Sequence, residues 1–212
     1  MIDQPLGTIC EIMSIMKDKF CEILRSTGRE GVETVIGKLE KLGFFKAPAS
    51  TVFHLSCEGG LVQHSLNVCD MALMLRESMI ARDSTLEEKL PLESVIVTAL
   101  LHDVCKAEIY KEGFRNVKNE KTGEWEKVAR YEVDYSYCPL GHGEKSVIRL
   151  LSWGFNLTQD EILAIRWPMP AWDLPFQSNE QKGNINAAKN KCPLLTILQC
   201  ADGLASGILE VK

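Results

Sequence analysis

The segment from Leu92 to Lys106 constrains the fold most, because it is almost entirely apolar and yet carries a histidine and an aspartate side by side. A helix that is apolar on every side is typical of the centre of a protein, so we predict a central helix over Leu92–Lys106. His102 and Asp103 follow the apolar run Val95–Leu101 and are expected to be buried with it. Burying a carboxylate without a partner is costly, which indicates that the pair shares a metal ion or a functional network.

Most of the remaining chain carries apolar residues at helical spacing. We predict helices over 7–25, 30–42 (ending at Gly43), Leu61–Arg82, 142–153, 158–167 and 193–210. The fold class is therefore all-α.

Three segments break the helical spacing. Residues 113–134 flank the turn-like sequence Lys121-Thr122-Gly123-Glu124, which predicts a small, polar, exposed β-hairpin inserted between helices. Residues 44–60 contain Pro48 and the pair Gly59-Gly60 and are expected to be irregular. Residues 168–191 are rich in Pro, Asn and Gln and are predicted to form a long loop, of the kind that often serves as a lid or a partner surface.

Composition excludes several functional classes. The net charge of -5 argues against broad nucleic-acid binding and against an anionic membrane surface. The longest apolar run is too short to span a bilayer, and the N-terminus lacks the order of a signal peptide. Eight cysteines are scattered without a CxxC pair, which favours free thiols and a reduced, cytoplasmic protein.

Polar residues of the kinds that bind metals stand at four places in the helical pattern. These are His64 near a helix start, the pair His102-Asp103, His142 at the start of a later helix, and Asp202 inside an apolar final helix. Imidazole nitrogen and carboxylate oxygen together suit Mn, Fe, Co, Ni, Zn or Mg. Such a cation polarises a phosphoryl oxygen and activates water at neutral pH. The alternatives to metal binding are a helix cap at His142, a hydrogen bond to a helix end at Asp202, and packing without a metal.

The order of these residues resembles that of the HD-domain superfamily of metal-dependent phosphohydrolases. The resemblance runs from about Phe53 to Glu210 and is carried by Glu58-Gly59-Gly60-Leu61-Val62-Gln63-His64-Ser65, Ala99 to Lys106, Gly141-His142-Gly143-Glu144 and Ala201-Asp202. It implies an HD-domain helical bundle over 46–212, with residues 1–45 as a helical extension that packs on it. It also implies that His64, His102, Asp103 and Asp202 coordinate one divalent metal ion, with Asp103 able to bridge to a second.

Further residues are assigned roles beside that metal. Asp103 is expected to orient the attacking water, and Lys106 shares its helical face and is expected to contact the substrate phosphate. Lys106 also suits a solvated lysine favoured by the helix dipole. Arg166 is expected to neutralise phosphate charge, with a surface ion pair as the alternative. His142 is interpreted as a weak second-site ligand, a substrate contact or a general acid, and His54 as a structural or rim residue.

One position departs from the two-metal members of the superfamily. The resemblance places a further histidine near Arg166-Trp167, where this chain has Pro168, and the chain contains four histidines in all. This departure argues against a complete second metal site, so we expect one tightly bound metal.

The expected reaction is hydrolysis of a phosphomonoester or phosphodiester through metal-activated water. About 50 residues precede the matched region and indicate helices, not an oligonucleotide-binding domain. A nucleotide or another small phosphate ester is therefore the expected substrate. Two alternatives stay open: a non-catalytic HD module that binds a nucleotide or a partner protein, which Pro168 favours, and a di-iron oxidative enzyme, which requires about six protein ligands.

Overall fold

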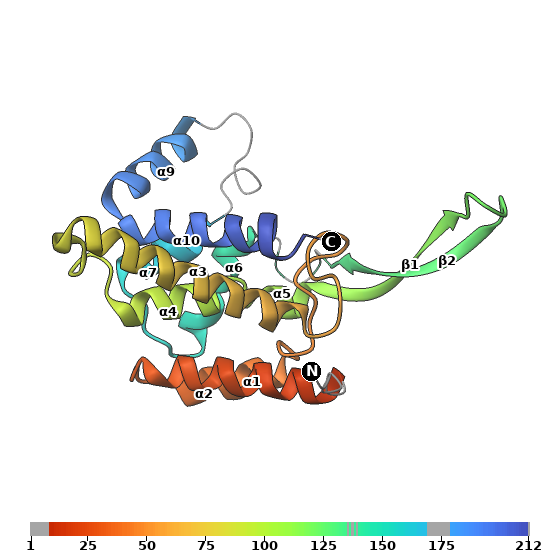
Figure 1. The fold of residues 1–212 in the computed structure, drawn as a ribbon, viewed down its shortest axis with the longest axis horizontal. Coiled ribbons are helices and arrows are strands. Elements are labelled where there is room, and N and C mark those ends of the chain that lie inside the picture. The colour runs from red at the N-terminus through yellow and green to blue at the C-terminus, as the bar shows by residue number, and fades with distance from the viewer. Residues whose placement is uncertain (1–8, 135, 137, 139, 169–178, 212) are drawn as a thin grey trace, which may run out of the picture.

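The structure is a computed structural model that describes residues 9–134, 136, 138, 140–168 and 179–211 (Figure 1). Helices dominate it, and the described residues contain one two-stranded antiparallel sheet, so the expectation of a mostly helical protein with a β-hairpin is confirmed. The described elements are α1 (Ile9–Ser26), α2 (Val32–Lys41), α3 (Gly60–Arg82), η1 (Ser84–Leu86), α4 (Leu92–Leu101), α5 (Lys106–Ile109), β1 (Tyr110–Lys118), β2 (Trp125–Val133), α6 (His142–Ser152), α7 (Gln159–Arg166), α9 (Asn179–Lys191), α10 (Pro193–Leu204) and η2 (Ala205–Leu209).

Three helices form the centre of the protein. α3 packs against both α4 and α10, and α10 also packs against α7 (Figure 1). Every residue of α4 from Ser94 to Leu101 is buried, as the apolar sequence of this helix predicts. Because α4 and α10 both contact α3, polar side chains on these three helices can meet inside the protein.

The N-terminal helices cover one side of this centre. α1 packs against α3 and α4, and the rings of Phe20, Phe44 and Phe45 form a contacting cluster with centroid separations of 5.3 to 5.5 Å. These residues belong to the same buried apolar cluster as the residues of α4. Between α1 and α2, Arg29 forms a bidentate ion pair with Glu161 of α7, so the N-terminal segment is joined to the rest of the protein by charge as well as by apolar contact.

The helix predicted over Leu92–Lys106 is interrupted. α4 ends at Leu101, and residues 102–105 form a turn before the short helix α5. The backbone tightens in this turn, because the amide of Lys106 bonds to the carbonyl of Asp103 three residues earlier, at 2.9 Å. His102 and Asp103 therefore lie just after the end of α4 and not in the middle of a helix.

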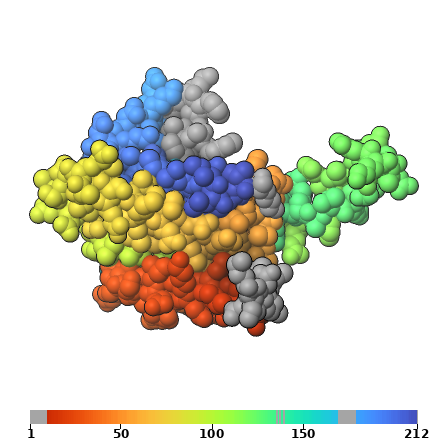
Figure 2. Space-filling model, viewed as in Figure 1, coloured from red at the N-terminus to blue at the C-terminus, as the bar shows by residue number. Residues whose placement is uncertain are grey.

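The inserted hairpin projects from the helical body (Figure 1 and Figure 2). β1 and β2 pair in register from Tyr110 opposite Val133 to Lys118 opposite Trp125, so β1 begins three residues before the predicted hairpin. Phe114 and Trp125 are about two-thirds exposed at 68% and 70%. The hairpin is thus held mainly by its own ladder of hydrogen bonds.

The loop predicted over 168–191 is wrong for its second half, where residues 179–191 form α9. The loop was predicted from the Pro, Asn and Gln content of residues 168–191, but Gln itself, with the Glu, Lys and Ala of residues 179–191, favours a helix. Ile185 and Ala188, three residues apart, are buried and give α9 an apolar contact with the core. The first half of the predicted loop, 169–178, lies outside the described residues.

Among the described helices, none alone is both long and apolar enough to cross a membrane. α9 and the chain from Pro193 to Leu209 meet the length and composition only together, across a bend of 102°. All eight cysteines are free thiols.

Candidate metal centre

The four predicted metal ligands come from the three central helices. His64 lies in the second turn of α3, His102 and Asp103 follow the last residue of α4, and Asp202 lies near the end of α10. The packing of α3 against α4 and α10 brings these segments together. All four side chains are buried, with exposures of 0%, 0%, 2% and 7% in that order.

Ligand atoms of His64, His102 and Asp103 lie within 4.8 Å of one another, whereas Asp202 is outside this group and approaches His64 alone. Asp103 Oδ2 lies 3.3 Å from His102 Nε2 and 3.6 Å from His64 Nε2, and Asp202 Oδ1 lies 3.5 Å from His64 Nε2. Metal bonds of about 2.0–2.2 Å in a tetrahedral site place ligand atoms roughly 3.3–3.6 Å apart. The spacing of these atoms therefore fits a divalent cation held among them.

The atoms of this group also lack hydrogen bonds. His64 Nε2, His102 Nε2 and Asp103 Oδ2 are buried and have no hydrogen-bond partner among the described residues. Buried polar atoms in native proteins nearly always have partners. A cation would satisfy all three atoms at once, and nitrogen with carboxylate oxygen is a donor set that such cations accept. The described residues can therefore hold a metal ion, as predicted.

Lys106 is the fifth residue of the cluster. It is buried, so the alternative of a solvated lysine is wrong. Its Nζ lies 2.6 Å from Asp103 Oδ2, in an ion pair that lacks the angles of a hydrogen bond. Burial disfavours the charge on both groups, but their mutual attraction is larger in effect: the pKa of Lys106 is raised and the pKa of Asp103 is held well below its usual range.

The second nitrogen of each imidazole is held by a separate acceptor. His102 Nδ1 lies 2.9 Å from the carbonyl oxygen of Ala99, and His64 Nδ1 lies 3.0 Å from Glu210 Oε2. Sequence reasoning did not assign Glu210 a role. Its position after Ile208 and Leu209, where a further apolar residue would suit the pattern, is the one signal that could have found it.

His54 lies beside the cluster, at the edge of an irregular loop. Its ring centroid is 5.0 Å from that of His64, and its buried Nε2 has no hydrogen-bond partner among the described residues. Leu55, the next residue, has a φ of 44°, a strained value for a side chain that is not glycine, and Ser50 anchors the turn by donating to the carbonyl of His54 at 2.7 Å. Burial lowers the pKa of His54, so its ring is neutral near pH 7.

Two further predicted residues, His142 and Arg166, contact other parts of the chain. His142 is the first residue of α6, and its Nδ1 lies 3.8 Å from the thiol of Cys105. Arg166, the last residue of α7, forms an ion pair with Glu144 at 2.6 Å, and with an exposure of 15% for the arginine side chain this pair is partly buried and differs from the surface ion pair of the alternative interpretation. Within the described part of the chain, His142 belongs to neither group of ligand atoms that lie within 4.8 Å of one another. Pro168 is buried two residues after α7 ends, where it prevents the helix from continuing.

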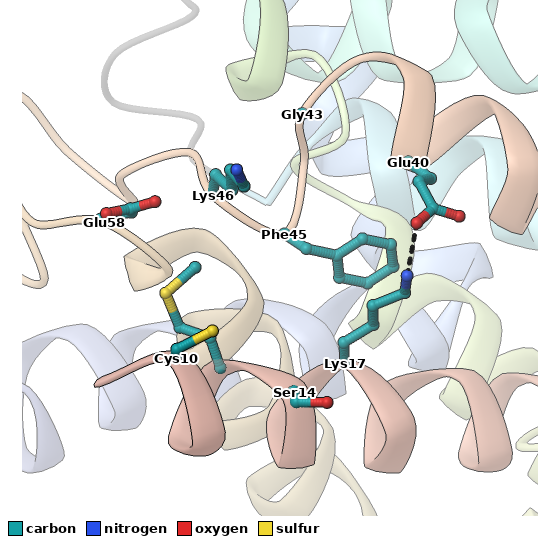
Figure 3. A pocket seen from close by; sticks show the side chains of 9 residues that line it. Cys10, Ser14, Lys17, Glu40, Gly43, Phe45, Lys46 and Glu58 are labelled. Atoms are coloured by element: carbon teal, nitrogen blue, oxygen red, sulfur yellow. Dashed lines mark hydrogen bonds and ion pairs between the residues drawn. The ribbon is translucent and has the colours of Figure 1, made fainter. Parts of the chain in front are cut away.

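Several grooves open on the surface of the described residues. One, of about 620 Å³, is lined by residues of α1 and of the chain after α2, including Lys17, Phe45 and Glu58 (Figure 3). It contains none of the candidate ligands, so we do not assign it to the metal centre. Another, of about 580 Å³, is lined by residues 51, 52, 56 and 57 of the loop that carries His54 and by residues 112–115 and 128–131 of the hairpin, which include Arg115, Arg130 and Tyr131; it too contains none of the candidate ligands.

In the comparisons with known proteins, no family model, no curated protein and no solved structure matches this chain.

Proposed function

We propose that this chain is a metal-dependent phosphohydrolase of the HD superfamily that acts on a nucleotide or another small phosphate ester. The observation that carries the proposal is the convergence of three buried ligand atoms without hydrogen bonds, on His64, His102 and Asp103. Asp202 adds a carboxylate oxygen at 3.5 Å from the first of these. The order of these four residues along the chain is the order in which the HD superfamily carries its ligands.

The centre would hold one divalent cation through His64, His102, Asp103 and Asp202. A cation bound there would polarise a phosphoryl oxygen and activate water for attack on phosphorus. Two imidazoles and two carboxylates leave a net charge near zero with a divalent cation, and the ammonium of Lys106 adds one positive charge beside them. The carboxylate of Glu210, 3.0 Å from His64 Nδ1, adds one negative charge on the other side of that ring, so the cation and the ammonium of Lys106 themselves, and not an overall excess of charge, would attract a phosphate group.

The groove between the loop at His54 and the base of the hairpin is the surface we propose for the rest of the substrate. Arg115 and Arg130 can neutralise phosphate oxygens, and Tyr131 offers an aromatic ring. None of the candidate ligands lines this groove either. We place it beside the centre because its walls belong to the loop that carries His54 and to β1, which begins four residues after Lys106. Arg166 is held by Glu144, so in this proposal it supports α6 and not the phosphate.

The proposal is tested by hydrolysis assays on protein stripped of metal and reloaded separately with Mn, Fe, Co, Ni, Zn or Mg. The substrates are 4-nitrophenyl phosphate, bis(4-nitrophenyl) phosphate and a set of nucleotides. We expect turnover only with metal, and a loss of at least about 100-fold in Asp103→Ala, because a metal centre supplies several kcal/mol to the transition state. Asp18→Ala, which removes an exposed carboxylate on α1, is the matched control and should keep full activity.

Nucleotide binding, metal content and oxygen consumption of the same protein separate the alternatives. Tight nucleotide binding without turnover under any metal would favour a non-catalytic HD module. Two iron atoms per chain together with oxygen consumption would favour the di-iron oxidative enzyme. Either result would overturn the proposed hydrolase.

A further inference from the structure

The C-terminal end of the described chain reverses the usual partition of polar and apolar residues. Ile208, Leu209 and Val211 are exposed at 67%, 54% and 65%, whereas Glu210 between them is buried with 6% exposure. Burying a carboxylate while leaving three large apolar side chains in solvent lowers stability on its own. Apolar packing therefore does not explain why Glu210 is buried, which indicates that its carboxylate makes a specific polar interaction.

A π-helical turn precedes Glu210 and places its carboxylate inside the protein. After α10, residues 205–209 form the π-helical turn η2, and the amide of Glu210 bonds to the carbonyl of Ala205 at 3.0 Å. Single π turns are rare and occur frequently at functional sites. η2 packs against α3, so the wider turn directs Glu210 toward the helix that carries His64.

Glu210 makes its short contacts with one histidine, His64, and its Oε2 lies farther from His54 Nε2, at 4.0 Å. Its Oε1 and Oε2 lie 3.1 Å and 3.0 Å from His64 Nδ1, and Oε1 also accepts a hydrogen bond of 2.9 Å from Asn67. Asn67 lies one turn after His64 on α3, so two side chains of that helix form hydrogen bonds with the carboxylate of Glu210. An ionised carboxylate can only accept, so His64 must carry its proton on Nδ1.

This hydrogen bond decides which face of the His64 ring can bind a cation. With the proton on Nδ1, the lone pair lies on Nε2, the atom that faces Asp103 and Asp202. His102 is fixed in the same tautomer by the carbonyl of Ala99. Because a free imidazole exchanges between two tautomers and rotates, a fixed second nitrogen raises the affinity of the first for metal.

We propose that Glu210 is a positioning residue of the metal centre: it holds the His64 ring in the orientation and tautomer that present Nε2 to the cation. This inference rests on the proposed metal site. Glu210 itself contacts neither the substrate nor the cation in this proposal. A loss of this hydrogen bond is expected to weaken metal binding by about 10- to 100-fold.

The experiment compares two variants of similar side-chain size. Glu210→Gln keeps an oxygen that accepts from His64 Nδ1 and from Asn67, whereas Glu210→Met removes the acceptor without leaving a void. Zn²⁺ affinity is measured by competition with a chromogenic chelator, and folding is followed by circular dichroism. Glu88→Gln, at an exposed position, is the control. The tautomer of His64 is read from a long-range ¹H–¹⁵N spectrum, which resolves each ring because the chain has four histidines.

We expect Glu210→Met to stay folded, to bind Zn²⁺ about 10- to 100-fold more weakly and to lose the Nδ1–H tautomer of His64. Glu210→Gln should keep that tautomer and bind much closer to the wild type. A folded Glu210→Met with wild-type affinity and the wild-type tautomer would overturn the inference while leaving the metal site intact. A wild-type protein that binds neither Zn²⁺ nor Mn²⁺, Fe²⁺, Co²⁺, Ni²⁺ or Mg²⁺ would instead overturn the proposed function.

A second cation between His54, His64 and Glu210 is the rival interpretation of this cluster, since their ligand atoms also lie within 4.8 Å of one another. It requires His64 to bind metal through both ring nitrogens. Two Zn²⁺ per wild-type chain, falling to one in both His54→Ala and Glu210→Met, would contradict the positioning role. If Glu210→Met does not fold, Asn67→Ala replaces it, because it removes one hydrogen bond to Glu210 and keeps the carboxylate. A mixture of His64 tautomers in Asn67→Ala would support the positioning role. The wild-type tautomer with wild-type Zn²⁺ affinity would contradict it.

Discussion

At the scale of single residues, the pairing of buried charges determines the behaviour of the site. Lys106 and Asp103 lie 2.6 Å apart inside the protein, where each compensates the charge of the other. Removing one member of such a pair leaves an uncompensated buried charge, which is among the most destabilising changes that a single substitution can make. In this protein a cation at the candidate site would supply a second source of compensation for Asp103.

This gives a prediction for Lys106→Met, which keeps the length of the side chain and removes its charge. Without metal, we expect the free energy of unfolding to fall by about 3 kcal/mol or more. Added Zn²⁺ or Mn²⁺ should restore much of that loss, because the cation then balances Asp103. Thermal unfolding with and without metal measures both effects. A melting temperature that responds to metal no more than in the wild type would contradict the prediction.

Much of the site was predictable at this scale, and the reason is local. His102, Asp103 and Asp202 interrupt apolar sequences, so their burial and hence their need for partners could be predicted from the sequence alone. Glu210 could not be assigned in this way, because its partner His64 lies 146 residues away and the π turn that joins them has no recognised sequence pattern. Lys106 was placed correctly beside Asp103, but its burial was not foreseen.

At the scale of elements, close contacts between helices fix the frame around the centre. Gly143 in the first turn of α6 packs on the end of α7, where an added Cβ would lie 2.4 Å from the carbonyl oxygens of both Ile165 and Arg166. Backbone atoms at that distance cannot yield without shifting the helices. The glycine is therefore required for the contact that places His142 beside the turn after α4.

Gly143→Ala is accordingly expected to destabilise the protein by about 1–3 kcal/mol through overpacking. Gly37→Ala in α2 is the matched control, because an added Cβ there meets nothing within 4 Å. It should stabilise the protein by about 0.5–1 kcal/mol, since alanine favours a helix over glycine. Urea unfolding of both variants checks the pair, and equal effects of the two substitutions would refute the argument.

The elements themselves were predicted well where their apolar spacing is strong, as in α1, α2, α3, α6, α7 and the hairpin. The two errors have physical causes. α4 ends five residues early because a tight turn and a helix share nearly the same spacing over four residues. α9 forms in a polar, Asn-rich segment because Ile185 and Ala188 gain contacts with the core, which local propensity does not include.

At the scale of the whole molecule, one buried network joins distant parts of the chain. Glu161 accepts from Arg29 at 2.6 Å, from Ser94 at 2.8 Å and from the amide of Thr158 at 2.8 Å. The N-terminal segment, α4 and the start of α7 thus meet at a single carboxylate. Burial alone would raise the pKa of Glu161, but the hydrogen bonds that its carboxylate accepts have the larger effect and hold this pKa below the ordinary value of a glutamate.

A pH dependence of stability follows from this shift. Because the folded pKa lies below the unfolded one, Glu161 stabilises the protein fully above about pH 4.5, and this contribution is lost as pH falls through the folded pKa. Glu161→Gln should lower the free energy of unfolding at pH 7 by about 2 kcal/mol. The difference between wild type and variant should shrink toward pH 3, as measured by denaturant unfolding at each pH. A constant difference would show that the charge of Glu161 is not responsible.

The central claim is that four buried side chains hold one divalent cation. The most direct test is the metal content per chain, by mass spectrometry, of wild type and Asp103→Ala purified without chelators or a histidine tag. We predict about one metal ion per wild-type chain, absent from the variant. Because Asp103→Ala also leaves Lys106 without its partner, Asp202→Ala, which keeps that ion pair, is measured beside it and is expected to lose metal while remaining folded by circular dichroism. No metal in the wild type, even after a divalent cation is added back and the excess is removed, would contradict the claim.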